Sequence, residues 1–127
     1  MKRDDRGAVA VEMALLLPVL VLLLLGIMEF GRAYNAQVTL TNAAREGVRV
    51  MAITNVRADA RTAAKNVATT LALTDSSFTF NTTPASSPAT CAAGRQVTVT
   101  ISYSLDTLTG IAGPFSMTGK GVMQCGG

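Results

Sequence analysis

One acidic residue, Glu12, stands inside an apolar segment near the start of the chain. The segment from Ala8 to Met28 holds no other charge, and leucine dominates it between Leu15 and Leu25. A carboxylate in a membrane-spanning helix costs about 2.5–3.5 kcal/mol at the helix centre and less near an end, so such residues usually have a function. We therefore predict a role for Glu12 beyond anchoring. The alternative is that its side chain simply reaches the lipid headgroups.

Two cysteines, Cys91 and Cys125, lie far downstream of the apolar segment. A cysteine pair in a small domain outside the cytoplasm indicates a disulfide, because such domains have little core and lie in oxidising compartments. A bond between them would close a loop worth about 3–4 kcal/mol in the chain-entropy model. Two free buried thiols are the alternative. Two thiols without histidine cannot form a four-ligand zinc site.

No enzymatic constellation is recognisable in the sequence. The chain has no histidine, the commonest general base and metal ligand. Lys65 and Lys120 lie in no Ser–Lys motif, and the glycines at Gly110 and Gly113 lack the length and lysine of a phosphate loop. The net charge of +3 is spread along the chain, unlike a nucleic-acid footprint. We predict no enzyme, metal, cofactor, small-molecule substrate or nucleic acid.

The apolar segment is long enough to cross a membrane as one helix, since about 20 helical residues span the hydrocarbon core. Basic residues slightly outnumber acids in Met1–Arg6, which predicts a cytoplasmic N-terminus and a single pass. We place the transmembrane helix at 8–34. An ordinary secretory signal is disfavoured, because the segment is too long and contains Glu12. Glu29 and Arg32 are spaced to pair on one helix face at the outer interface, or to reach separately for headgroups.

The helix is expected to continue as an amphipathic helix of a domain at 35–127. A stripe of apolar and small residues at helical spacing extends the helix to about Ala52: Leu40, Ala44, Gly47, Val48 and Met51. A second helix is expected at about 56–73, with Asn55 as its N-cap and Thr74–Ser77 as its end. Its basic stripe, Arg57, Arg61 and Lys65, indicates either a solvated face or a docking surface for acidic neighbours.

Beyond the second helix the sequence predicts a small three-stranded antiparallel sheet, at about 77–125. The clearest strand is Gln96–Ser104, in which Val97, Val99, Ile101 and Tyr103 share one face. Ser77–Asn81 and Phe115–Met123 are the other two strands. Gly119 and Gly121 in the last strand indicate a β-bulge. The predicted fold class is α+β.

Three elements of the N-terminal part occur together in a characteristic order. They are a short basic leader with Gly7-Ala8 and then Glu12, the segment Glu29-Phe30-Gly31-Arg32, and the segment Asn42-Ala43-Ala44-Arg45-Glu46-Gly47. In this order they resemble the TadE-like minor pseudopilins of the tight-adherence (Tad/Flp) pilus system. The close resemblance covers about the first 50 residues. It implies a type IV pilin-like layout, with a long N-terminal helix carrying a small domain.

The resemblance also implies processing. A prepilin peptidase would remove residues 1–7 by cutting between Gly7 and Ala8, and the mature protein would lie in the bacterial inner membrane. The expected partners are other pilins or pseudopilins and the pilus assembly platform. The amine created at Ala8 would be positive, so Glu12 of a neighbouring subunit could neutralise it and fix the register between helices.

Two rival interpretations remain at the level of the sequence. One is a pseudopilin-like component of another envelope secretion machine. The other is an uncleaved, membrane-anchored binding or sensory module outside the cytoplasm.

Overall fold

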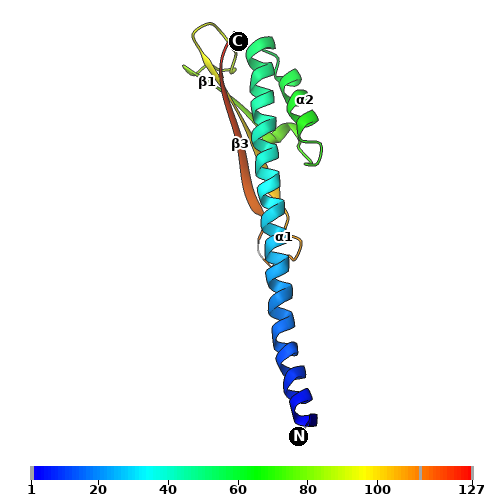
Figure 1. The fold of residues 1–127 in the computed structure, drawn as a ribbon. Coiled ribbons are helices and arrows are strands. Elements are labelled where there is room, and N and C mark those ends of the chain that lie inside the picture. The colour runs from blue at the N-terminus through cyan, green and yellow to red at the C-terminus, as the bar shows by residue number, and fades with distance from the viewer. Residues whose placement is uncertain (1, 112, 127) are drawn as a thin grey trace. The chain divides into compact units, whose positions relative to one another are not determined.

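The computed structural model describes residues 2–111 and 113–126, with side chains from Asp5 onward. Its elements are α1 (Lys2–Thr54), α2 (Arg57–Val67), the 3₁₀ turn η1 (Asp75–Ser77), β1 (Phe78–Thr83), β2 (Gln96–Leu105) and β3 (Phe115–Gln124) (Figure 1). The α+β class, the long N-terminal helix, the second helix and the three-stranded antiparallel sheet are all as predicted. The chain divides into two compact units, Met1–Arg32 and Ala33–Gly127.

The first unit consists of the N-terminal part of α1. The helix begins at Lys2 rather than at the predicted Ala8 and continues through Gly7 without a break. It continues through Pro18. Among the described residues, one helix is long and apolar enough to cross a membrane. Its most apolar window has a mean hydropathy of 2.7 and buries none of its residues within the protein.

The second unit packs two helices on one face of the sheet. The strands lie in the order β1-β2-β3, both pairs antiparallel. Gly47 of α1 lies against the Ala64 side chain of α2 and the Val99 side chain of β2, so the three elements meet around one residue. The core they enclose consists mainly of alanine and aliphatic residues: Leu40, Ala43, Ala44, Val48, Met51, Ala52, Ala60, Ala64, Ala68, Phe78, Val97, Val99 and Ile101.

The amphipathic patterns predicted from the sequence match the buried faces. The α1 stripe from Leu40 to Met51 is buried. In β2, Val97, Val99 and Ile101 are fully buried and Tyr103 is half-buried, while the intervening residues are at least partly exposed. Both faces therefore point to the same core, as the periods of helix and strand require.

Gly119 and Gly121 do not form the β-bulge that we considered. Both keep the regular β2–β3 register, opposite Ile101 and Val99 respectively. A Cβ atom at Gly119 would lie 2.5 Å from the carbonyl oxygen of Leu40, and one at Gly121 would lie 2.6 Å from that of Ala44. The two glycines share one face of β3, and their lack of side chains lets the backbone of α1 approach the strand closely.

The second helix is shorter than predicted. It ends at Val67 rather than near residue 73, and Ala68 closes its last turn by donating its N–H to the Ala64 carbonyl. Two β-branched threonines follow, and Leu71 and Leu73 pack on the core from an irregular segment. The Thr74–Ser77 segment does not end this helix but forms η1, with Thr74 and Ser77 bonded to each other.

Replacing Gly121 by alanine should destabilise the second unit, because the new methyl group would collide with the α1 backbone. Overpacking of this kind costs about 1–3 kcal/mol, and each kcal/mol lowers the midpoint of a domain this size by about 4–8 °C. Thermal unfolding of the full chain in detergent micelles, followed by circular dichroism, measures the effect. Gly113→Ala is the matched control, since a Cβ there meets nothing within 4 Å. Equal midpoints for the two variants would contradict the packing described.

Candidate processing and assembly surface

The predicted processing residues lie on the exposed part of α1. Gly7, Ala8 and Glu12 are exposed, and the helix is continuous across the Gly7–Ala8 bond. A Cβ at Gly7 would meet nothing within 4 Å. Ala8 and Glu12 are four residues apart and so lie on one helix face. The structure therefore leaves both residues accessible to another molecule.

Glu12 has no cation of its own chain beside it. Ion pairs in the described part of the chain join Glu29 to Arg32, Glu46 to Arg49 and Lys65 to Asp75, and Glu12 belongs to none of these. Its neighbours Val11 and Met13 are exposed apolar side chains. A carboxylate in this setting can be neutralised by a positive group of a neighbouring molecule or by headgroups.

The pair Glu29 and Arg32 lies further along α1. One guanidinium nitrogen of Arg32 is 4.0 Å from a carboxylate oxygen of Glu29, at the i,i+3 spacing expected from the sequence. The Arg32 side chain is more exposed than that of Glu29. Their position at a membrane interface stays a prediction.

The motif from Asn42 to Gly47 divides into a packing face and a polar face. Ala43, Ala44 and Gly47 are buried, and Gly47 lies 3.3 Å, measured from its ideal Cβ, from the Ala64 methyl group. Asn42 and Arg45 are exposed, and Glu46 lies 3.8 Å from Arg49 on the same helix. The small residues of this motif thus build the domain itself, and only the polar ones face outward.

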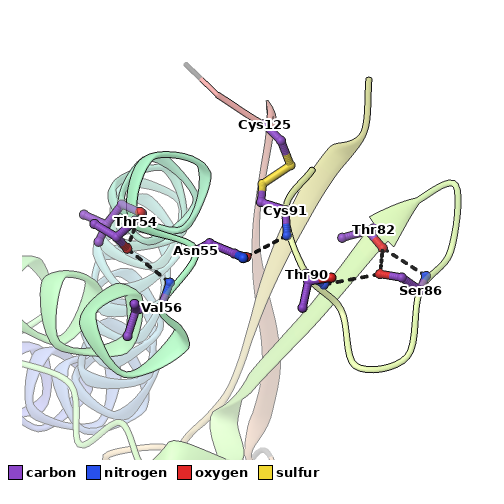
Figure 2. The surroundings of a disulfide bond; sticks show 9 residues. Thr54, Asn55, Val56, Thr82, Ser86, Thr90, Cys91 and Cys125 are labelled. Atoms are coloured by element: carbon purple, nitrogen blue, oxygen red, sulfur yellow. Dashed lines mark hydrogen bonds between the residues drawn. A yellow bond between two sulfur atoms is a disulfide. The ribbon is translucent and has the colours of Figure 1, made fainter. Parts of the chain in front are cut away.

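A disulfide joins Cys91, in the segment before β2, to Cys125, directly after β3, as predicted (Figure 2). The Cys91 N–H donates to the Asn55 side-chain oxygen at 2.6 Å, and the Gly126 N–H donates to the Ala52 carbonyl at 3.1 Å. We call these contacts the terminal clasp: the disulfide, Asn55 and the Gly126–Ala52 bond. The clasp holds the C-terminal end of β3 against the last turn of α1.

Asn55 does not cap α2, as the sequence predicted, but terminates α1. Its φ of 55° is in the left-handed region, which asparagine tolerates better than most residues, and its N–H donates to the Met51 carbonyl. Its side-chain oxygen accepts the hydrogen bond from the Cys91 N–H. The N-cap position of α2 is Val56, whose side chain makes no capping hydrogen bond. The Thr54 hydroxyl accepts the Val56 N–H instead (Figure 2).

The basic stripe of α2 holds the helix to the rest of the domain. Arg57 donates to the Ala89 carbonyl at 3.0 Å, Arg61 stacks over the Phe80 ring at 5.4 Å, and Lys65 binds Asp75 at 2.5 Å. Each of these three charges therefore has a partner within the chain. A docking role of the stripe for acidic neighbours stays a prediction. The sequence pattern of α2 could not predict these contacts, because the partners lie outside α2, in η1, in β1 and in the segment between β1 and β2.

The described residues contain no group of three or more acidic or cysteine residues close enough to hold a metal ion. A shallow depression beside η1 is lined largely by hydroxyls, among them Ser76, Ser102, Ser104 and Ser116.

Comparison with known proteins supports the sequence resemblance. Residues 7–49 match the family model for TadE-like protein. This confirms the resemblance for the N-terminal third of the chain and suggests a role related to the Tad pilus. No curated protein and no solved structure matches.

Two substitutions of Asn55 test its role in the terminal clasp. Asn55→Ala should lose the bond to Cys91 and also place alanine in the left-handed region, which costs about 1–2 kcal/mol. Asn55→Gly should lose only the bond, because glycine adopts positive φ freely. Thermal unfolding in micelles should therefore rank wild type above Asn55→Gly and Asn55→Ala lowest. Asn55→Ala as stable as wild type would contradict the role of Asn55.

The Lys65–Asp75 pair predicts a pH dependence of stability. The Lys65 ammonium, through its hydrogen bond and its charge, lowers the pKa of Asp75 below the ordinary value of 3.8. A carboxyl with a lowered pKa stabilises the fold above its unfolded pKa and loses that contribution as pH falls through the folded value. Asp75→Asn should thus be less stable than wild type at neutral pH, and the difference should shrink as the pH falls below about 3.8 and vanish below the lowered pKa that Asp75 has in the folded state. Unfolding midpoints of both proteins across this range measure it. A difference that does not change with pH would refute the assignment.

Proposed function

We propose, on the basis of the TadE-like match at residues 7–49, that this protein is a minor pseudopilin acting in assembly of a Tad/Flp-type pilus. In this proposal a prepilin peptidase cuts after Gly7, and the helix from Ala8 spans the bacterial inner membrane. The N-terminus faces the cytoplasm and the domain at 35–127 lies outside it. Other pilins or pseudopilins and the assembly platform are its partners.

The observation that carries the proposal is the exposure of the whole apolar part of α1. The domain core is complete without it, since the core begins at Ala36 and Leu40. Large apolar side chains from Val9 to Met28, with the exception of Leu25, are about half exposed or more. A helix that is apolar all round requires an apolar surrounding. A membrane supplies it before assembly, and neighbouring helices supply it afterwards.

Glu12 has a specific place in this proposal. Cleavage would create a positive amine at Ala8, on the same helix face as Glu12. Within one subunit the Glu12 carboxylate and the Ala8 amine would lie on the same helix. The Ala8 amine of a neighbouring subunit can also approach Glu12 from the side, and the carboxylate would then neutralise that amine in a region of low dielectric constant. Such a pair would favour lateral association at one register. The rival is an uncleaved anchor, for which Glu12 would have no partner amine.

The mature N-terminus separates these functions. With the chain expressed beside its host's prepilin peptidase, intact-mass spectrometry should show a protein beginning at Ala8. A chain that retains Met1 would support the uncleaved anchor, and a start near Gln37 would indicate ordinary secretion.

Glu12→Gln should keep the size of the side chain and remove its charge. We expect it to reduce recovery of the protein with other pilus components by about tenfold or more, the effect of about 1.4 kcal/mol. Val11→Gln is the matched control, since it adds the same polar group to the neighbouring face. Unchanged processing and co-purification of Glu12→Gln would contradict the role of Glu12.

A further inference from the structure

The turn between β2 and β3 carries three exposed apolar side chains. Leu108 is 54% exposed, Ile111 is 79% exposed and Phe115, at the start of β3, is 39% exposed. We call these three residues the hairpin tip. Single exposed apolar residues are ordinary on soluble proteins, but a cluster marks a contact with an apolar surface.

The charge pattern around the hairpin tip is consistent with such a contact. Asp106 precedes the tip, and no charged residue follows until Lys120. Burying this stretch would therefore remove no ionised side chain from water, which is the main cost of entering a membrane interface. The turn between β1 and β2, at the other end of the sheet, has a different composition. It consists of small and polar residues, among them Ala85, Ser86 and Ser87.

The position of the tip within the second unit follows from its contacts. Gln37 donates to the Thr118 carbonyl at 2.9 Å, and Gly126 donates to the Ala52 carbonyl at 3.1 Å. β3 therefore runs along α1 in the same direction as the helix, and its first residues lie at the end of the unit where α1 enters. The tip lies at that end, and the terminal clasp lies at the opposite one (Figure 1).

The entry of α1 is also where the apolar segment ends. The segment stops at Met28, a few residues before the second unit begins at Ala33. Tyr34, at the entry, is 70% exposed, and tyrosine is enriched where membrane meets water. The membrane that the preceding helix would cross is therefore the apolar surface that we assign to this end of the domain.

We propose that the hairpin tip inserts into the outer headgroup region of the lipid bilayer that α1 spans. This inference rests on the proposed membrane span, and it adds a second attachment point. A single helix leaves a domain free to rotate about the helix axis. Insertion of Ile111 and Leu108 would fix one face of the domain toward the membrane, and leaving the membrane would then require this contact to break.

The chain contains no tryptophan, so single substitutions give clean fluorescent reporters. Ile111→Trp reports on the tip. Ala85→Trp, exposed in the opposite turn, is the matched control, and Leu20→Trp reports on the span. Each full-length variant is reconstituted in phosphatidylcholine vesicles without brominated lipid, with lipids brominated near the headgroup end of the acyl chain, and with lipids brominated near its methyl end. The first brominated lipid tests the tip reporters and the second tests Leu20→Trp.

The proposal predicts blue-shifted emission from Ile111→Trp, quenched by the brominated lipid, because interfacial side chains lie about 5–10 Å into the headgroup and acyl boundary. Ala85→Trp should emit as in water and remain unquenched. Leu108→Trp is the second tip reporter should Ile111→Trp fail to fold, and it should behave in the same way.

Three results would overturn the proposal. Quenching of Leu20→Trp without quenching of either tip reporter would refute the tip contact and leave the proposed function intact. No quenching of Leu20→Trp would refute the membrane span, and the tip contact with it. A blue shift of the tip reporter that brominated lipid does not quench, and that disappears as the protein is diluted in lipid, would show that a second copy covers the tip.

Discussion

The close approach of α1 to β3 is the contact on which the domain depends. The helix backbone at Leu40 and Ala44 lies directly on Gly119 and Gly121, and α2 packs less closely on Gly47, where a Cβ would lie 3.3 Å from the Ala64 methyl group. Small residues on every element make this possible, and they also leave little large apolar surface to bury. A domain of this size with few aromatic residues gains less from its core than most. The disulfide and the bonds of the terminal clasp compensate at the far end, where they hold β3 along the helix that it packs against.

The same helix meets two different environments. From Ala36 onward its apolar residues form a stripe that faces the sheet, and its charged residues face water. Before Met28 the apolar residues are distributed all round, as in helices that lie in lipid or among other helices. Both parts belong to one α-helix, Lys2–Thr54.

The sequence predicted the parts of the fold that have a period. The α1 stripe from Leu40 to Met51 and the alternation in β2 identified the core faces correctly, and the cysteine pair identified the disulfide. The errors occurred where a distant partner decides a local conformation. Asn55 has the right chemistry for an N-cap, but Cys91 occupies its side chain. The basic stripe of α2 has the pattern of a solvated face, but Ala89, Phe80 and Asp75 bind it. Gly119 and Gly121 are two residues apart and so lie on one face of the strand. This spacing was the sequence signal that the α1 backbone approaches β3 closely there.

The central claim is that the exposed part of α1 becomes buried against the helices of neighbouring subunits at one register. Single cysteines placed in turn from Ala14 to Val21, in cells making the other pilus components, test it directly by oxidative cross-linking between subunits. The account predicts that cross-linking recurs every three to four residues and weakens in Glu12→Gln. Uniformly absent or uniformly weak cross-linking along the segment, with the protein present in the membrane, would contradict it.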